Sequence, residues 1–384
     1  MKVLWICGLP NEVRLKGWRD ALSSLTTPAW SWILGHLPPP DNIELHILCP
    51  VVGLVANRID FKYNGAHWHC FRRKSFRHIF AYLWHNVLVR RFVGELKPDV
   101  VHGWGGETGF GYLATRISRN SVVSVQGLLV PLYKLSPAAF KREMGRAYAH
   151  YRIWREKRTY KRASILITES GFAHSALVEI YGHDSKLIPH PLREAFVAQK
   201  VDARRSATPK FVYVGSLIAR KGALDVIKAF CLLKSSDAKL IMIGSGPEKN
   251  KIRDIIREND LQGRVELIDK CSQYEIATIM RQSHFFTLPT YGDTGPTALK
   301  EALACGLFPI CYDNSGPHEY LTRYCGYLVP TGDVEAYSAA MNKAVVHQAD
   351  CIKLAENAAS KIKMDLSKEM VWQKLEFVYK EILK

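Results

Sequence analysis

Two blocks of alternating strand and helix signals, separated by a polar segment, limit the folds that this chain can adopt. In the first block, longer helical stretches alternate with apolar runs of strand length, which are KVLWIC, IELHILC, DVVHGW, SVVSVQG and ASILITES. The same alternation begins again at KFVYVGS and continues to LFPICYD. Apolar strands joined by helices are typical of parallel sheets that are covered on both faces. We therefore predict an α/β protein with two Rossmann-like, doubly wound parallel-sheet domains.

The polar segment between the blocks sets the predicted domain boundary. Its sequence, LREAFVAQKVDARRSATP at 192–209, has no strand signal and is typical of a linker. We predict an N-terminal domain over 1–191 and a C-terminal domain over 192–365 that includes this linker. A last helix is predicted over 366–384, and its apolar stripe indicates packing against protein. Two such domains are expected to face a ligand-binding cleft.

The composition excludes several classes of protein. The apolar runs are shorter than the roughly 20 residues that a membrane-spanning helix needs. The N-terminal MKVLWICGLP predicts a first strand and not a signal peptide, because charged residues follow where a cleavage site would stand. Nine cysteines are scattered without a C-x-x-C pair, so we expect reduced thiols and no zinc site. Together these features predict a cytoplasmic protein.

The net charge of +17 is concentrated in the first block. Residues 1–190 hold 26 Lys and Arg against 13 Asp and Glu, whereas residues 191–384 hold 27 against 23. This charge favours an anionic partner, for which a membrane leaflet, a phosphorylated lipid and nucleic acid are the candidates. Two basic stretches rich in aromatic residues, FRRKSFRHIFAYLW and YAHYRIWREKRTYKR, indicate peripheral docking on an anionic leaflet. The alternative is a solvated helix face with its aromatic side chains in the core.

The second block opens with a strand, a glycine turn and a basic pair in FVYVGSLIARKGALDV. A turn between a strand and a helix exposes backbone amides and the positive end of the helix dipole. Gly215 allows the backbone to approach a ligand, and Ser216 follows it. Arg220 and Lys221 would add positive charge for a diphosphate. Taken alone, this segment is equally typical of a solvated basic turn.

A later segment, TLPTYGDTGPTALKEALACG, places two carboxylates around the start of a helix. The strand is expected to end at Pro289, and the helix is expected to begin near Pro296 or Thr297. Asp293 lies in the loop, and Glu301 lies one turn into the helix. Carboxylates in such positions accept hydrogen bonds from sugar hydroxyls. A surface or capping role is the alternative for Glu301.

The order and spacing of these segments resemble the donor half of family-4-type retaining glycosyltransferases, the glycosyl transferases group 1, which have the GT-B fold. The glycine turns of LIMIGSGPEKNKI and ICYDNSGPHEYL belong to the same pattern. The resemblance covers essentially the whole second block and extends more weakly to KPDVVHGW, SVVSVQG and LIPHPLREAF in the first. The family signature is Glu, seven residues, Glu. It is Asp293, seven residues, Glu301 in this chain.

The resemblance implies a role for each matching residue. Glu301 would hold the donor ribose hydroxyls, and Asp293 would lie beside the transferred sugar. Lys221 matches the phosphate-binding lysine of the family. With Arg220 it would act on the leaving diphosphate, so Asp293, Arg220 and Lys221 are the predicted catalytic residues. The other predicted donor contacts are Gly215, Ser216, Gly295, Pro296, Thr297, Ala298 and Glu301.

The chain also departs from the family pattern. Ser216 stands where the family has an arginine, and we expect Arg220 to compensate. Gln126 stands where a histidine is common, and the pair His190-Pro191 replaces Asn-Gly. The changes at Gln126 and His190-Pro191, together with the shorter side chain of Asp293, affect the expected geometry around the donor sugar and leave the predicted diphosphate site intact.

The activity that the resemblance implies is transfer of a hexosyl group from a UDP- or GDP-sugar with retention of anomeric configuration. Positive groups would stabilise the leaving diphosphate. No D-x-D motif occurs, so we expect no metal and no other cofactor. We expect the acceptor to be a saccharide, in particular a lipid-linked saccharide of bacterial surface-polysaccharide biosynthesis. The acceptor-side candidates are Trp18, His102, Glu107 and Gln126, with burial as the alternative for His102 and helix capping for Glu107.

Three other functions remain as alternatives. A catalytically weak sugar-nucleotide-binding protein would account for Asp293 in place of glutamate. A nucleic-acid-binding protein would account for the charge, but the chain lacks an RRM, helix-turn-helix or zinc signature. An inverting transferase of the GT-B type would need a dedicated general base.

Overall fold

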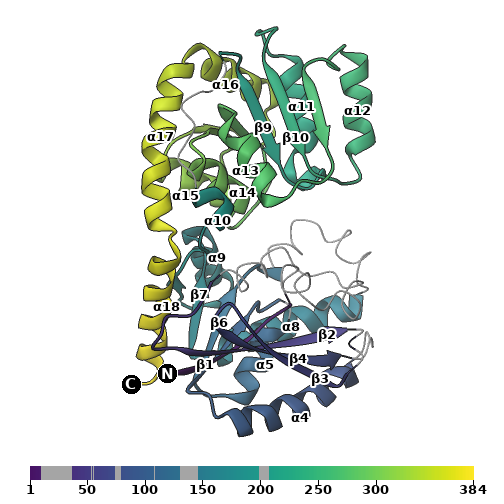
Figure 1. Cartoon of the computed structure of the whole chain (residues 1–384). Helices are drawn as coiled ribbons and strands as arrows, with labels where there is room; N and C mark the ends of the chain where they lie inside the picture. The colour runs from purple at the N-terminus through teal and green to yellow at the C-terminus, as the bar shows by residue number, and fades with distance from the viewer. Residues whose placement is uncertain are drawn as a thin grey trace. The chain divides into compact units, whose positions relative to one another are not determined.

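The chain forms two compact units in the computed structural model, which describes residues 1–9, 37–52, 54, 56–73, 79–107, 109–129, 146–198 and 207–384. The first unit comprises Met1–His190 together with Lys368–Lys384, and the second unit comprises Pro191–Ser367. Figure 1 shows helices packed around a sheet in each unit. The α/β fold with two sheet domains agrees with the prediction from the sequence.

The sheet of the first unit has the strand order β3-β4-β2-β1-β5-β6-β7-β8 among the described residues. All its strand pairs are parallel except β3 and β4, which form an antiparallel hairpin at one edge. Asn64 and Gly65 form the turn of this hairpin with φ angles of 49° and 76°, which two-residue hairpin turns require. The strands are β1 (Lys2–Ile6), β2 (Glu44–Val52), β3 (Arg58–Tyr63), β4 (Ala66–Arg73), β5 (Val100–Trp104), β6 (Ser121–Val125), β7 (Ile165–Thr168) and β8 (Lys186–Leu187).

The last helix of the chain packs on the core of the first unit. Its residues Val371, Trp372, Leu375, Val378 and Tyr379 are buried, in agreement with the apolar stripe in the sequence. The ring of Trp372 stacks on that of Trp5, with centroids 5.4 Å apart. The helices of this unit are α4 (Ile79–Leu96), α5 (Phe110–Ile117), α8 (Arg146–Arg162), α9 (Gly171–Tyr181) and the last helix, α18 (Lys368–Ile382).

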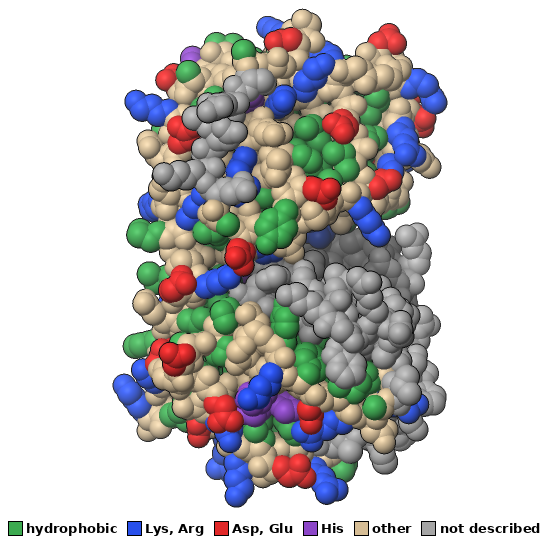
Figure 2. Space-filling model, in the orientation of Figure 1, with side chains coloured by type: hydrophobic (Ala, Val, Ile, Leu, Met, Phe, Trp, Pro, Cys, Tyr) green, Lys and Arg blue, Asp and Glu red, His purple; other side chains and the backbone are tan. Residues whose placement is uncertain are grey.

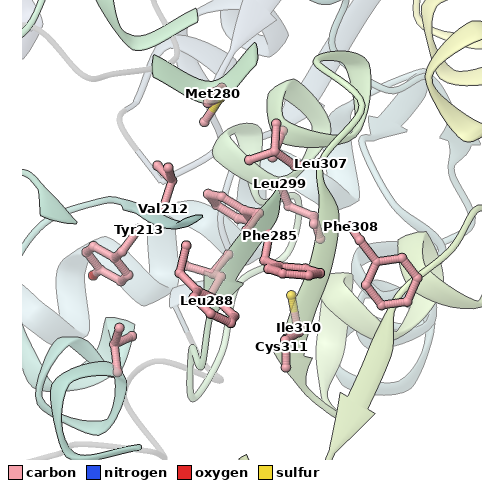
Figure 3. Packing of buried hydrophobic residues seen from close by; sticks show 14 of the residues in the cluster. Val212, Tyr213, Met280, Phe285, Leu288, Leu299, Leu307, Phe308, Ile310 and Cys311 are labelled. Carbon is pink, nitrogen blue, oxygen red and sulfur yellow. The ribbon is translucent and has the colours of Figure 1, made fainter. Parts of the chain in front are cut away.

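The sheet of the second unit is parallel throughout its described pairs and has the strand order β11-β10-β9-β12-β13-β14. Figure 3 shows how side chains of its central strands, such as Phe285 and Ile310, meet those of the covering helices, such as Met280 and Leu299. These four side chains are fully buried and form part of the core between the sheet and its helices. The strands are β9 (Lys210–Val214), β10 (Lys239–Ile243), β11 (Val265–Ile268), β12 (Phe285–Leu288), β13 (Phe308–Tyr312) and β14 (Tyr327–Val329).

The helices of the second unit begin inside the segment that the sequence predicted as a linker. They are α10 (Glu194–Val197), the 3-10 helix η2 (Ala219–Lys221), α11 (Ala223–Cys231), α12 (Lys249–Glu258), α13 (Gln273–Arg281), α14 (Thr297–Ala304), α15 (Ser315–Arg323), α16 (Val334–Val346) and α17 (Gln348–Asp365). None of the helices in the described part of the chain is long and apolar enough to cross a membrane.

The prediction of a linker over 192–209 is therefore wrong for its first residues. Phe196, on α10, is fully buried, and Arg281 donates a hydrogen bond to the backbone oxygen of Ala195. The amide of Leu192 donates to the oxygen of Leu366 at 3.0 Å. These contacts make the first residues of the segment part of the core of the second unit. The sequence did not indicate this, because the segment is mostly polar and Phe196 is its only aromatic residue. The rest of the predicted linker falls largely on 199–206, outside the described residues.

Candidate functional site

The two motif segments of the second unit lie at the same edge of its sheet. They follow β9 and β12, which are parallel neighbours, so both turns emerge at the carboxyl ends of adjacent strands. Gly222, the N-cap of α11, has a φ of 66°, and a Cβ atom there would lie 1.9 Å from the backbone oxygen of Pro289. A glycine is therefore required for the two segments to pass this closely.

Hydrogen bonds join the segments at this close approach. The amide of Tyr291 donates to the oxygen of Arg220 at 2.8 Å, and the Nη1 of Arg220 donates to the oxygen of Gly292 at 2.6 Å. The Nζ of Lys221 forms an ion pair with Oδ2 of Asp293. The three predicted catalytic residues, Arg220, Lys221 and Asp293, are thus brought together by the fold.

Three tyrosine and aspartate side chains support the loop that carries Asp293. The hydroxyls of Tyr291 and Tyr312 both donate to Oδ2 of Asp225, at 2.8 and 3.0 Å. The backbone oxygen of Asp293 accepts a hydrogen bond from the amide of Gly316 at 2.8 Å. These contacts tie the loop to α11 and to the start of α15.

The start of α14 agrees with the sequence prediction, because the helix begins at Thr297 with Pro296 as its cap. The amides of Leu299 and Lys300 donate to the oxygen of Pro296. Thr297 and Ala298 are partly exposed, whereas Gly295 and Pro296 are buried. The positive end of the helix dipole and its first amides therefore lie next to the loop of Asp293, an arrangement that favours an anion.

Glu301, on α14, has a partner that the sequence did not predict. Its side chain is 1% exposed, and its two carboxylate oxygens accept hydrogen bonds from Nε and Nη2 of Arg193 at 2.5 and 2.7 Å. Burial raises the pKa of Glu301, and the charge of Arg193 lowers it. The surface or capping alternative for Glu301 is wrong, because the side chain points into the unit. The predicted contact with a ribose diol stays a prediction, since an arginine holds this carboxylate in the structure.

Gly215 and Ser216 form the turn directly after β9. The amide of Gly215 donates to the oxygen of Ile243 at 3.0 Å, and a Cβ atom at this position would lie 3.2 Å from the hydroxyl of Tyr213. Ser216 is exposed, and its backbone oxygen accepts a hydrogen bond from the Tyr213 hydroxyl at 2.9 Å. The turn is therefore held in place by β9 and by its neighbour β10.

The structure contradicts the prediction that His102 lies on the acceptor side. His102 is fully buried in the first unit, where Nδ1 is 2.7 Å from the Tyr379 hydroxyl and Nε2 is 2.8 Å from the Ser124 hydroxyl. Burial lowers the pKa of His102 to about 3, so the ring is neutral at physiological pH. His102 links β5, β6 and α18, and the alternative of a buried structural role is the correct one.

Glu107 and Gln126 lie after the neighbouring strands β5 and β6 and are both partly exposed. The helix that follows Glu107 has Gly109 as its N-cap, so the capping alternative for Glu107 is wrong. The remaining acceptor-side candidate, Trp18, lies outside the described residues.

Helix α8 covers these two loops with residues that the sequence analysis did not single out. The Nη2 atoms of Arg152 and Arg155 donate to the backbone oxygen of Glu107 at 3.1 and 2.8 Å. The carboxylate of Glu156 accepts hydrogen bonds from the amide of Leu129 at 3.0 and 3.2 Å. The sequence signal that could have identified Glu156 is that it is the single acidic residue in a strongly basic helix. Such a residue is often buried with hydrogen-bonding partners.

Comparison with known families gives a match within the second unit. Residues 197–361 match the family model described as glycosyl transferases group 1. The matched segment contains both motif segments of the candidate site.

Curated relatives carry related names. AmsK of Erwinia amylovora, an amylovoran biosynthesis glycosyltransferase, is 27% identical over 175 residues, which is 43% of each chain. TuaC of Bacillus subtilis, a putative teichuronic acid biosynthesis glycosyltransferase, is 22% identical over 263 residues, or 65% of this chain and 62% of the relative. The matches thus span less than two thirds of the length of these relatives.

Solved structures match the whole chain. Sucrose-phosphate synthase from Thermosynechococcus elongatus has a TM-score of 0.79 at 16% identity, covering 100% of this chain and 99% of that one. The Anabaena protein HepE, solved in complex with UDP and glucose, has a TM-score of 0.71 at 14% identity, covering 99% and 100%. The chain therefore has the GT-B fold of these glycosyltransferase structures.

Proposed function

We propose that this protein transfers a sugar from a nucleotide-sugar donor to a saccharide acceptor, with the donor bound at the candidate site of the second unit. The observation that carries the proposal is the convergence of Arg220, Lys221, Asp293 and the start of α14 at one edge of the sheet. The group 1 match over the same segment supports it.

The charges of this site fit the needs of the reaction. Cleavage of a glycosyl–phosphate bond develops positive charge on the sugar ring and negative charge on the leaving diphosphate. Arg220, Lys221 and the first amides of α14 supply positive potential for the leaving group, and Asp293 supplies a carboxylate for the sugar side. Preorganised groups of this kind are typically worth about 3 kcal/mol each in the transition state.

We further propose a hexosyl donor based on UDP or GDP, retention of anomeric configuration and no metal requirement. Retention would follow from attack on the same face of the sugar that the diphosphate leaves. In that case the leaving phosphate could take the proton of the attacking hydroxyl. The fixed cations Arg220 and Lys221 would then do the work that a metal does in transferases with a D-x-D motif.

The acceptor that we propose is a lipid-linked saccharide of bacterial surface-polysaccharide biosynthesis. The names of the relatives from Erwinia amylovora and Bacillus subtilis support this class of product. We also propose peripheral contact of the first unit with an anionic membrane leaflet. Tyr148 and Trp154 on α8 are 45% and 49% exposed on a helix whose single acidic residue is buried, which supports that contact.

The face drawn in Figure 2 carries mixed charge among its described residues. Figure 2 shows Lys and Arg side chains interspersed with Asp and Glu on one face of each unit, and His side chains gathered on the first unit. Among the described residues on this face, the mixed charge is unlike the uniform basic tract that nucleic-acid binding favours.

The test of the donor site is the thermal stability of the protein with UDP, GDP and ADP and their sugar conjugates, without added metal. A nucleotide at 100 times its dissociation constant stabilises the folded state by about 2.7 kcal/mol, which is a clear rise in Tm. We expect Tm to rise with the nucleotides of one base only. We expect this rise to be smaller in the Lys221→Ala variant. The matched control is Lys228→Ala, an exposed lysine of α11, which should leave the rise unchanged. No rise with any of these nucleotides would contradict the proposal.

A catalytically weak sugar-nucleotide-binding protein is the second candidate. The observation that favours it is the shorter Asp293 carboxylate, which is already held by Lys221. Binding of a nucleotide sugar without glycosyl transfer or hydrolysis would support this candidate over a transferase.

A further inference from the structure

Three histidines gather beside the edge hairpin of the first unit, in a different unit from the candidate site. His46 lies on β2, and His67 and His69 lie on β4, which is the parallel neighbour of β2. Figure 2 shows His side chains gathered on the first unit among charged side chains. The motifs that the sequence analysis singled out do not include these residues.

Hydrogen bonds join two of these rings to each other and to a carboxylate at each end. Nε2 of His46 lies 2.9 Å from Oε1 of Glu44, and Nδ1 of His46 lies 2.9 Å from Nε2 of His69. Nδ1 of His69 lies 2.9 Å from Oδ1 of Asp60. These four residues, which we call the histidine network, therefore link β2, β4 and β3 through their side chains.

Both carboxylates of the histidine network are ionised at neutral pH. The pKa of Glu44 is lowered, chiefly by its hydrogen bond with His46. Burial raises the pKa of Asp60, but hydrogen bonds with Arg58 and His69 lower it further, so that the net shift is downward. An ionised carboxylate only accepts hydrogen bonds, so the ring nitrogen that faces it must carry a proton.

The geometry of the network fixes how many protons the two rings hold. The outer nitrogen of each ring carries a proton for its carboxylate, and the contact between the inner nitrogens requires one more. Two neutral imidazoles carry two protons in total, whereas these contacts require three. His46 and His69 therefore share one positive charge, and they titrate as a coupled pair.

The surroundings of the rings oppose a second added proton. The ring of His67 stacks on that of His46, with centroids 4.8 Å apart and an angle of 21°. On the other side, the ring of Phe92 from α4 lies 4.6 Å from that of His69. The described titratable and charged side chains around the three rings are Lys2 from β1, Glu44 from β2, Arg58, Asp60 and Lys62 from β3, and the histidines themselves.

A second proton on the pair would break the hydrogen bond between its rings. Burial lowers the pKa of His69, against the opposing effect of Asp60, and burial and the charge of His46 lower the pKa of His67. The additional proton is therefore taken up only below the ordinary histidine pKa of about 6.5. Both inner nitrogens then carry protons, so neither of them can accept, and two positive rings face each other.

The contact between His46 and His69 ties the outer hairpin to the rest of the sheet. Among the described strands, β3 pairs with β4 alone, at the edge of the sheet. Asp60 lies opposite His69 in the register of this hairpin. The guanidinium of Arg58, which also donates to Asp60, lies 4.8 Å from the centroid of the Phe92 ring. Loss of the contact between the two rings removes a side-chain link from β4 to β2 and places like charges across it.

We propose that the histidine network is a pH switch built into the first unit. Near neutral pH, one shared positive charge holds the hairpin of β3 and β4 against β2, and a further proton in mild acid loosens the hairpin. Below about pH 6.5 the opened hairpin binds more protons than the closed one, so closure weakens as the pH falls. The inference goes beyond the proposed function and does not depend on it.

Hydrogen exchange of the whole protein, measured between about pH 5 and pH 8, tests the switch. The protection of amides in 58–73 is taken relative to the intrinsic exchange rate at each pH, and the amides of β6 report general opening of the same unit. We expect protection of 58–73 to fall by up to about 10-fold per pH unit below about pH 6.5. Protection of β6 should fall less over the same range.

Two variants separate the switch from a general effect of acid. His69→Gln removes the titrating ring but keeps a side-chain N–H that can donate to Nδ1 of His46, so hairpin protection should lose its dependence on pH. His347→Gln is the matched control, because it changes an exposed histidine of the second unit and should behave as the wild type. Equal pH dependence in wild type and His69→Gln, or no fall in the wild type, would overturn the proposal.

A measurement on the wild type alone counts the protons directly. Selective ¹⁵N labelling of histidine reports the protonation of each ring nitrogen by NMR, and a coupling between Nδ1 of His46 and Nε2 of His69 across their hydrogen bond identifies the pair. At about pH 7 we expect three protons over the four nitrogens of these rings. Two neutral rings at this pH would overturn the proposal even if His69→Gln failed to fold.

Discussion

Arg193 holds the carboxylate of Glu301 through two hydrogen bonds, with Nε 2.5 Å from Oε1 and Nη2 2.7 Å from Oε2. The two residues are 108 positions apart in the chain, and the glutamate is almost fully buried. A buried charge is tolerated when a partner of opposite charge satisfies it.

Removing one partner of this pair should destabilise the fold more than removing both. We expect Arg193→Ala to lower the free energy of unfolding by about 3 kcal/mol, because the Glu301 carboxylate is left buried without a partner. The penalty should shrink as the pH falls, since protonation removes the buried charge. Urea unfolding of Arg193→Ala, Glu301→Gln and the double variant measures this. Additive losses in the double variant would contradict the coupling.

Gly222 should tolerate no side chain, unlike a glycine in the adjacent loop. Gly222→Ala places a Cβ atom against the oxygen of Pro289 and requires a φ of 66°. We expect a lower Tm and a loss of nucleotide binding, because the segments of Lys221 and Asp293 are pushed apart. Gly292→Ala is the matched control, since nothing lies within 4 Å of its Cβ position. A Tm loss of the same size in both variants would argue against the close approach at Gly222.

Lys221 should contribute more to the reaction than to donor binding. The positive charge of Lys221 stabilises the diphosphate most when that group leaves, so we expect Lys221→Ala to lower kcat by about 100-fold or more. Its effect on the Kd for the nucleotide should be smaller. Steady-state kinetics and titration of the nucleotide separate the two effects. A change confined to Kd would indicate that Lys221 binds ground state and transition state equally.

His102 should make the stability of the protein depend on pH below about 6.5. The pKa of His102 is about 3 in the folded chain, so the unfolded chain binds one more proton between about pH 3 and 6.5. Stability should therefore fall by about 1.4 kcal/mol for each pH unit in this window. His102→Gln should be less stable at pH 7 and should show a smaller slope from pH 6.5 to 5. Equal slopes in both proteins would contradict the assignment.

Helix α8 should govern membrane contact if the proposed docking is correct. Each basic residue near an anionic surface contributes about 1 kcal/mol, so Lys157→Gln with Lys161→Gln should weaken vesicle binding by about 30-fold. Both lysines are exposed on α8. Sedimentation with phosphatidylglycerol vesicles at low and high salt measures the effect. Phosphatidylcholine vesicles are the control, and equal binding to both kinds of vesicle would contradict an electrostatic contact.

The sequence by itself determined the fold class and the segments of the candidate site. Alternating apolar strands and amphipathic helices leave few arrangements other than parallel sheets covered by helices. The glycine turn before Arg220 and Lys221 and the proline at the start of α14 are local signals, because they depend on backbone geometry within a few residues. They could be identified without knowing what lies nearby in space.

Only the tertiary structure decided how distant residues are paired. Nothing in the sequence indicated that Arg193 pairs with Glu301 or that His102 forms a hydrogen bond with Tyr379. Nothing in it indicated that Arg155 of α8 donates to the backbone oxygen of Glu107. Each contact joins residues tens to hundreds of positions apart, and long-range contacts depend on how helices pack on a sheet. The types of the residues show which chemistry is available, whereas burial and partners decide which of them can use it.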